Sequence, residues 1–174
     1  SNGIDKKMII VMQCNTQYPT PYHDTNLNVI RTFMNQFGTR VGFSDHTLGV
    51  EVSLAAVAMG ACIIEKHLTT DNDLPGPDHK ASLNPRQFKS LVKGIKNIEM
   101  AMGGIEKTKT RSEEENIDIV RKSIVAKVEI QKGQVFTEDN LTTKRPGTGL
   151  SPMNWEKIIG RKSKYFFKKD DFIK

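Results

Sequence analysis

The sequence predicts an α/β fold of alternating strands and helices, followed by a small domain that is mostly β structure. Three short apolar runs rich in strand-forming residues, at 7–14, 42–46 and 62–69, predict three strands. Two segments between these runs and one after them have the apolar spacing of helices. The run at 7–14 is continuously apolar, which is typical of a strand buried on both faces of a parallel sheet.

The first two helices are predicted from their spacing and from the residues at their ends. Asp24 or Thr25 is placed to cap the start of the first helix, and Gly38 is placed to end it. The second helix is predicted over the small apolar residues at 50–60.

The third helix has the clearest ends. Asn84 is a capping residue, Pro85 suits the first turn, and Gly103 suits the residue that follows the last turn. Its apolar stripe comprises Phe88, Leu91, Val92, Ile95, Ile98 and Met102. The predicted order is therefore strand and helix, three times over.

Such a repeat is too short to close on itself. Three parallel strands with helices on one side expose an apolar sheet face and an unpaired edge. A closed (β/α)₈ barrel removes both, but it needs about 250 residues, and the repeating part here has only about 100. We therefore expect residues 1–104 to form three βα units of an incomplete barrel.

The composition changes beyond residue 104. Residues 105–122 are rich in Lys, Thr, Ser and Glu, which predicts a linker. Residues 123–174 predict a small, turn-rich and mostly β domain, with strands at 123–128 and 141–145 and a short helix near 153–159. A domain of roughly 50 residues has a thin core, so we expect it to lean on a neighbour or a partner subunit.

Composition and charge exclude several classes of protein. The net charge of +6 and the pI of about 9.3 favour anionic partners, but the lysines form no stripe interleaved with aromatics, which argues against nucleic-acid binding. A small acidic substrate is expected instead. The sequence has no apolar run of about 18 residues and no signal peptide, so we expect no membrane insertion. Cys14 and Cys62 lie in apolar runs, which predicts buried free thiols in a cytoplasmic protein.

Two histidines close consecutive predicted strands. His46 ends the second strand and His67 lies at the end of the third, and α/β folds place their chemistry at the carboxyl ends of parallel strands. Because side chains alternate along a strand, Ser44 shares a face with His46, and Glu65 shares a face with His67. If these faces meet, two imidazoles converge with a carboxylate nearby. A satisfied buried histidine is the structural alternative for His46.

Five motifs then resemble the sialic acid synthases, also called N-acetylneuraminate synthases. They are Tyr-Pro-Thr-Pro at 18–21, Gly-Phe-Ser-Asp-His-Thr-Leu-Gly at 42–49, Glu-Lys-His at 65–67, Gly-Pro-Asp-His-Lys-Ala-Ser at 76–82 and Lys-Arg-Pro-Gly-Thr-Gly at 144–149. The resemblance implies a (β/α)₈ TIM barrel followed by an antifreeze-like (SAF) domain. It implies that this chain corresponds to the last three βα units plus that domain, without the first five strands. It also implies a homodimer in which the SAF domain is swapped onto the partner's active site.

The resemblance implies a reaction and a metal ion. Family members join phosphoenolpyruvate to the aldehyde of N-acetylmannosamine and release phosphate, with Mn²⁺, or alternatively Mg²⁺ or Co²⁺, as the Lewis acid. His46 and His67 match the metal ligands, since imidazole suits first-row metals. Relatives use other acyl-amino sugars or make legionaminic and pseudaminic acids, and the sequence leaves this choice open.

Further roles follow by position from the same resemblance. Tyr18 matches a contact to the amino sugar, and Ser44 matches a contact to the phosphate of phosphoenolpyruvate. Asp78 matches an acid that binds sugar hydroxyls, and Arg145 matches an arginine that crosses the dimer to the N-acetyl group. Glu65 is expected to orient His67 or a sugar hydroxyl.

Some positions have competing interpretations. Where the family often has a phosphate-contacting asparagine, this chain has Thr16, with Asn15 one place earlier, so the role of both is open. Tyr18 is alternatively a packing residue at a turn, and the Arg145 loop is alternatively a plain exposed turn. The general acid and base groups of the family lie on the absent strands, so we expect the chain alone to be inactive. A non-catalytic carbohydrate-binding module built on the SAF domain is the alternative function.

Overall fold

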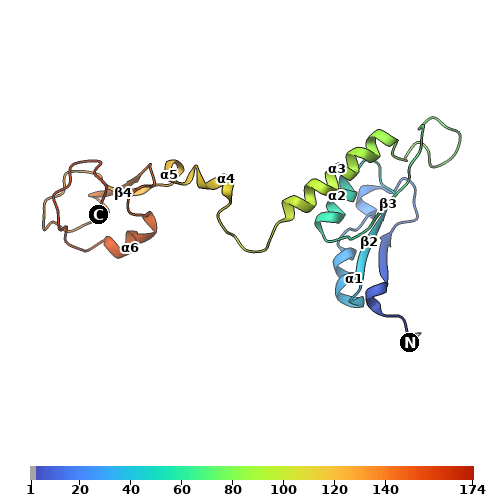
Figure 1. Cartoon of the computed structure of the whole chain (residues 1–174), viewed down its shortest axis with the longest axis horizontal. Coiled ribbons are helices and arrows are strands. Elements are labelled where there is room, and N and C mark those ends of the chain that lie inside the picture. Colours follow the sequence, from blue (N-terminus) through green and yellow to red (C-terminus); the bar gives the residue numbers. More distant parts are fainter. Residues whose placement is uncertain (1–2) are drawn as a thin grey trace. The chain divides into compact units, whose positions relative to one another are not determined.

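Three parallel strands form the sheet of the first of two structural units. A computed structural model describes residues 3–174, and the chain divides into Ser1–Ile105 and Glu106–Lys174. The sheet has the order β1 (Ile10–Cys14), β2 (Arg40–Asp45) and β3 (Ile64–Lys66), with both pairs parallel (Figure 1). Parallel neighbours bring their carboxyl ends to the same edge, which is where His46 and His67 follow their strands.

Each strand of this sheet is followed by a helix. These helices are α1 (Val29–Phe37), α2 (Glu51–Ala58) and α3 (Pro85–Met102), and α2 packs against both the sheet and α3. The buried core between helices and sheet comprises Ile30, Val41, Phe43, Ala56 and Ala61. The predicted α/β fold and the order of its strands and helices are confirmed.

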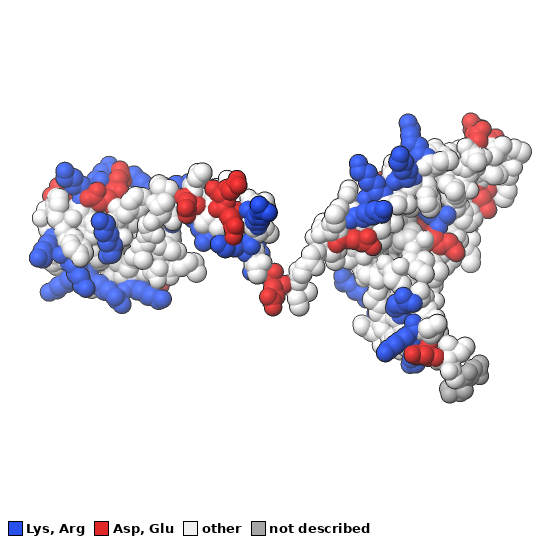
Figure 2. Space-filling view, in the orientation of Figure 1, with Lys and Arg blue, Asp and Glu red and all other residues white. Residues whose placement is uncertain are grey.

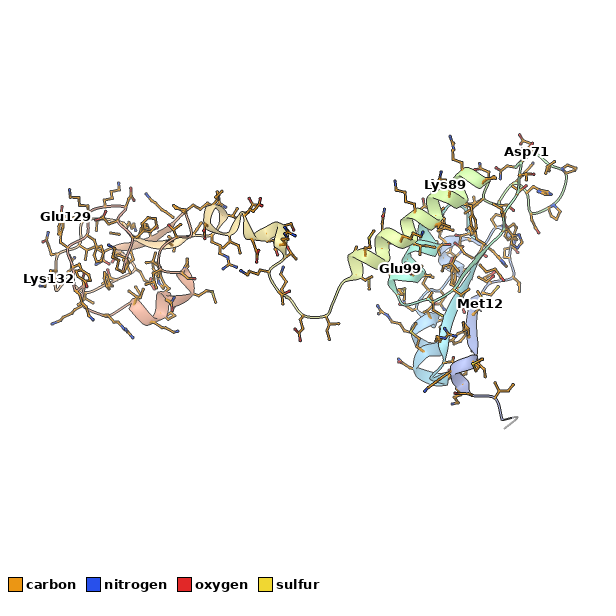
Figure 3. All side chains as sticks on the ribbon, viewed as in Figure 1. Met12, Asp71, Lys89, Glu99, Glu129 and Lys132 are labelled. Carbon is orange, nitrogen blue, oxygen red and sulfur yellow. The ribbon has the colours of Figure 1, made fainter. Side chains whose placement is uncertain are left out.

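Helix α3 begins and ends as predicted. The Asn84 side chain accepts a hydrogen bond from Gln87 N, and the Gln87 side chain accepts one from Asn84 N, which forms a capping box. Pro85 is the first helical residue, and Gly103 follows the last with a φ of 52°. The start of α3 is therefore also the end of the long loop that follows β3. Figure 3 labels Asp71 in this loop and Lys89 and Glu99 on α3.

The predicted start of α1 is wrong. Asp24 ends a short 3₁₀ helix (Tyr22–Asp24), and Thr25 donates its hydroxyl to Pro21 O, so neither side chain caps the α-helix. Helix α1 begins four residues after Thr25, at Val29, and Asn28 at its start makes no capping hydrogen bond. Gly38 ends the helix as predicted, with a φ of 62° that glycine adopts without strain.

The prediction of a fully buried first strand is also wrong. Residues Lys6–Met8 form a 3₁₀ turn capped by Asp5, and β1 itself is half-buried. Within residues 3–174, β1 pairs with β2 alone, so one edge of the strand is open. Cys14 and Cys62 are exposed rather than buried, because Cys14 ends this half-covered strand and Cys62 lines a surface groove beside α3.

The second unit begins with two short helices and continues as a small β domain. The helices are α4 (Arg111–Glu114) and α5 (Ile117–Val120), and they lie within the stretch predicted as a linker. Strands β4 (Ser123–Ala126) and β5 (Leu141–Lys144) pair antiparallel, and the helical turn η3 (Pro152–Asn154) leads into α6 (Trp155–Ile158). The core of this unit comprises Ile124, Ala126, Ile130, Phe136, Leu141, Ile158, Phe167 and Ile173.

The basic side chains are distributed over both units, as they are along the sequence. Figure 2 shows Lys and Arg side chains on both units, interspersed with Asp and Glu on the visible face. Among the helices that the structure describes, none is long and apolar enough to cross a membrane.

Candidate metal and substrate site

Strand register places the candidate site residues of β2 and β3 on one face. Ser44 pairs with Glu65, and the Ser44 hydroxyl donates to Glu65 Oε1 at 2.5 Å. Their neighbours Asp45 and Lys66 also pair in register, and alternation turns them to the opposite face. The two faces singled out in the sequence are thus a single surface in the folded sheet.

The two imidazoles lie close together at the edge of this surface. The ring centres of His46 and His67 are 5.1 Å apart, with an angle of 65° between the ring planes. The ring of Tyr18, which comes from the loop after β1, lies 5.1 Å from His46 and 4.2 Å from His67. Segments from the ends of all three strands therefore build one cluster of rings.

A backbone carbonyl sets the tautomer of His46. Its Nδ1 atom lies 2.7 Å from the carbonyl oxygen of Asn15, and a carbonyl only accepts, so Nδ1 carries the proton. In the neutral imidazole, Nε2 then carries the lone pair, 3.4 Å from Ser44 Oγ. The Asn15 side chain bonds the backbone of Asp24 and Gln17, while Thr16 is exposed.

Asp78 reaches the cluster from the loop after β3. Its Oδ2 atom lies 3.6 Å from His67 Nδ1, and the two side chains are 50% and 39% exposed. Ser82 donates its hydroxyl to Asp78 O, and its oxygen lies 3.3 Å from the Tyr18 hydroxyl. The partly exposed loop that carries Asp78 and Ser82 therefore contacts both the His67 imidazole and the Tyr18 phenol.

Two side chains hold this loop in place. The Asn72 amide donates to the carbonyls of His79 and Ser82, each at 2.8 Å. His79 Nδ1 lies 2.8 Å from the Thr69 hydroxyl. No sequence pattern indicated Asn72 or the hydroxyl of Ser82 as site residues, although Ser82 closes the motif at 76–82.

The surroundings of Tyr18 keep its phenol protonated. Partial burial raises the pKa of Tyr18 above 10.0, and the hydrogen bond with Ser82 opposes this effect. The carboxylates of Asp78 and Asp45 raise the pKa further, because they disfavour a second negative charge. At neutral pH the site therefore presents a neutral hydroxyl beside the two imidazoles.

The donor set fits a metal ion with open coordination positions. Two imidazoles that bind one ion at about 2.1 Å and at a roughly tetrahedral angle have ring centres about 5 Å apart. The 5.1 Å between His46 and His67 agrees with this spacing. Among residues 3–174, no cluster of three or more His, Cys, Asp or Glu side chains with metal-binding geometry is found. An ion here would therefore complete its coordination with water or substrate.

Arg145 belongs to the second unit and is described with it. Its side chain is exposed, and its Nε atom donates to Val120 O at 2.8 Å. Two residues later, Gly147 N donates to Asp118 O at 2.6 Å. The loop that carries Arg145 is thus fastened to α5, which is a more defined structure than a free surface turn.

Comparisons with known proteins match both parts of the chain. The model of the NeuB family matches residues 2–107, and the model of the SAF domain matches residues 121–174. An N,N'-diacetyllegionaminic acid synthase of Campylobacter jejuni is 47% identical, over 99% of this chain and 52% of the relative. A second N,N'-diacetyllegionaminic acid synthase, from Legionella pneumophila, is 41% identical over 87% of this chain and 43% of the relative.

A solved structure extends the comparison to the fold. The crystal structure of N-acetylneuraminic acid (sialic acid) synthetase from Leptospira borgpetersenii is 38% identical, with a TM-score of 0.56, and the match covers 62% of this chain and 38% of that one. The chain spans about half the length of the curated relatives it matches. These relatives are synthases of acid sugars, and the chain belongs to the NeuB family, with an SAF domain in its C-terminal part.

Proposed function

We propose that this chain is part of a synthase that joins phosphoenolpyruvate to the aldehyde of an acylated amino sugar. The product is a nine-carbon acid sugar, and phosphate is released. The observation that carries the proposal is the pair of neighbouring imidazoles, His46 and His67, with ring centres 5.1 Å apart, beside the Ser44–Glu65 hydrogen bond. Membership of the NeuB family supports it, because the two curated relatives described above are named synthases of an acid sugar.

His46 and His67 are the proposed ligands of a divalent ion, Mn²⁺ first, with Mg²⁺ or Co²⁺ as alternatives. When bound, the ion supplies Lewis-acid polarisation of the sugar aldehyde. The chain's own contribution is orientation: the Asn15 carbonyl holds the Nδ1 proton of His46 and leaves Nε2 free. The half-exposed Asp78 beside His67 accepts hydrogen bonds from sugar hydroxyls in this proposal.

In this proposal Ser44 contacts phosphoenolpyruvate and Glu65 contacts the sugar. The Ser44 hydroxyl can donate only one hydrogen bond, and in the structure it donates that bond to Glu65. To contact the phosphate of phosphoenolpyruvate, the hydroxyl turns away from Glu65 and donates to the anion instead. The carboxylate oxygen that it releases is then available to a sugar hydroxyl. The neutral phenol of Tyr18 contacts the amino sugar without adding charge.

Arg145 is proposed to act from a partner subunit. Its guanidinium is exposed on a loop fastened to α5, so it is available to a ligand outside its own unit. The proposed assembly is a homodimer with a swapped SAF domain, in which Arg145 contacts the N-acetyl group of the sugar. This assignment follows the family resemblance and is supported by the SAF match at 121–174.

The sugar is proposed to be of the diacetamido type. The two curated relatives described above are named N,N'-diacetyllegionaminic acid synthases. N-acetylmannosamine remains the comparison substrate, because the matching solved structure is named a sialic acid synthetase. A diacetamido sugar carries a second acetamido group where N-acetylmannosamine has a hydroxyl, so relative kcat/KM values with each sugar separate the two choices.

Phosphate release tests the proposal directly. The 174-residue chain and a form extended to the length of its relatives are each mixed with phosphoenolpyruvate, Mn²⁺ and either sugar. We expect turnover from the extended form only, and we expect His46→Ala to abolish that turnover. An extended form that binds sugar but releases no phosphate would favour a non-catalytic carbohydrate-binding module.

A further inference from the structure

A buried ion pair lies on the face of the sheet opposite the candidate site. Asp45 and Lys66 are register partners on β2 and β3, and Lys66 Nζ lies 3.0 Å from Asp45 Oδ2. The two side chains are 0% and 1% exposed, so both charges are removed from water. A buried pair of this kind is costly unless its remaining hydrogen-bonding capacity is filled.

The polar capacity of the pair is filled by its neighbours. Asp45 Oδ1 accepts from both the backbone N and the hydroxyl of Thr47, at 2.8 and 2.7 Å. Asp45 Oδ2 accepts from the Ser53 hydroxyl on α2, and Lys66 Nζ donates to Thr47 O. Thr47 and Ser53 are themselves buried, at 1% and 0% exposure. The network therefore joins β2, its following turn, β3 and α2 with defined hydrogen-bond directions.

This network brackets the site residues along both strands. Asp45 lies between Ser44 and His46 in the sequence, and Lys66 occupies the equivalent position on β3, directly before His67. Anchoring Asp45 and Thr47 fixes the backbone on both sides of His46. The backbone carbonyl of His46 accepts from Thr20 N at 2.8 Å, which adds a third anchor.

We infer that the Asp45–Lys66 pair is a positioning unit that sets the spacing and orientation of His46 and His67. An apolar pair of similar volume generally supports folding as well as a buried ion pair, but it lacks directional hydrogen bonds. The pair's specific contribution is the register between two strands whose other faces carry the imidazoles. The inference rests on the proposed function insofar as those imidazoles bind a metal ion.

The test removes both charges together, so that neither partner is left buried and unpaired. The double variant Asp45→Asn/Lys66→Met keeps the side-chain volumes close to the original. Ile30→Val, in the core of the same unit, is the control for general loss of stability. Two readouts are compared in the full 174-residue chain: the imidazole ¹⁵N shifts of His46 by NMR at pH 8, and Mn²⁺ binding by electron paramagnetic resonance.

The first readout does not require metal. In the parent chain we expect His46 to show one fixed tautomer with the proton on Nδ1. In the double variant we expect ¹⁵N shifts that move toward the average of two tautomers, with a Kd for Mn²⁺ at least tenfold higher. The Ile30→Val chain should keep the parent values. Unchanged His46 shifts in the folded double variant would overturn the inference.

Two further outcomes are also decisive. If the parent chain binds no Mn²⁺, the proposed metal site is wrong, and the tautomer comparison alone decides the positioning role. If the double variant does not fold, Ser53→Ala replaces it, since this change removes one donor to Asp45 and leaves the ion pair in place. We expect a smaller ¹⁵N shift in the same direction, and the absence of any shift would overturn the inference.

Discussion

The imidazole of His46 is bonded through Nδ1 to the backbone carbonyl of Asn15, across the junction of β2 and β1. This contact links the end of one strand to the segment that follows its neighbour. It also leaves Nε2 as the nitrogen available to a ligand. A metal site that depends on this nitrogen is therefore sensitive to the loop after β1 as well as to His46 itself.

Metal binding should depend on both imidazoles. We expect His46→Ala and His67→Ala each to raise the Kd for Mn²⁺ by at least about tenfold, because two protein ligands leave no spare one. The measurement uses tag-free chain in which the exposed Cys14 and Cys62 are replaced by serine. His23→Ala is the matched control, because the His23 side chain is 82% exposed and makes no contact with the ring cluster. Equal losses in the control and the two site variants would contradict the prediction.

Tyr18 should give the chain a distinct response to alkaline pH. Burial raises the pKa of this phenol above its unfolded value of 10.0, so the folded state favours the protonated form. The resulting stabilisation is complete below pH 10 and is lost as the pH rises from 10 through the folded pKa. Above pH 10 we expect the free energy of unfolding to fall less steeply in Tyr18→Phe than in the parent chain.

An ultraviolet titration checks the same point independently. The parent chain has three tyrosines, and we expect one phenol to ionise clearly above pH 10. This late step should be absent in Tyr18→Phe. It should be present in the control variant Tyr22→Phe, because Tyr22 is 62% exposed as a residue. A late step that persists in Tyr18→Phe would show that another phenol is responsible.

The capping box of α3 should contribute measurably to the stability of the first unit. Asn84→Ala removes the side-chain oxygen that accepts from Gln87 N, and we expect a loss of about 1 kcal/mol. Asn97→Ala, at an exposed position inside the same helix, should be neutral or slightly stabilising, since alanine favours helices. Amide hydrogen exchange of α3 measures both effects. A loss in Asn97→Ala equal to that in Asn84→Ala would contradict the assignment to the cap.

The sequence predicted best what depends on local pattern. The ends of α3 follow from Asn84, Pro85 and Gly103, which act within one turn of the helix. The common face of Ser44 and Glu65 follows from alternation along two neighbouring strands in parallel register. These features need only short-range periodicity and the rule that parallel strands end at one edge.

The sequence could not predict contacts between distant segments. Tyr18 and Ser82 meet across 64 positions, and no local pattern indicates that their hydroxyls are 3.3 Å apart. The prediction that Asp24 or Thr25 caps α1 was wrong because Asp24 belongs to a 3₁₀ helix and Thr25 is the residue that ends it. The Asn15 carbonyl is a backbone group, so the identity of its side chain carries no signal of the contact.

The loop that carries Arg145 should tolerate no side chain at Gly147. A Cβ atom at Gly147 would lie 2.5 Å from the Cβ atom of Arg121 and 3.2 Å from its carbonyl carbon, so the backbone near α5 would have to move. We expect Gly147→Ala to destabilise the second unit by about 1–3 kcal/mol, the usual cost of overpacking. Trp155 is the one tryptophan of the chain, so its fluorescence in a urea titration reports on this unit. Thr148→Ala, at the exposed next position, should leave the transition unchanged. A Gly147→Ala chain as stable as the control would mean that the loop shifts freely, and Arg145 would then lack the fixed position that its proposed role requires.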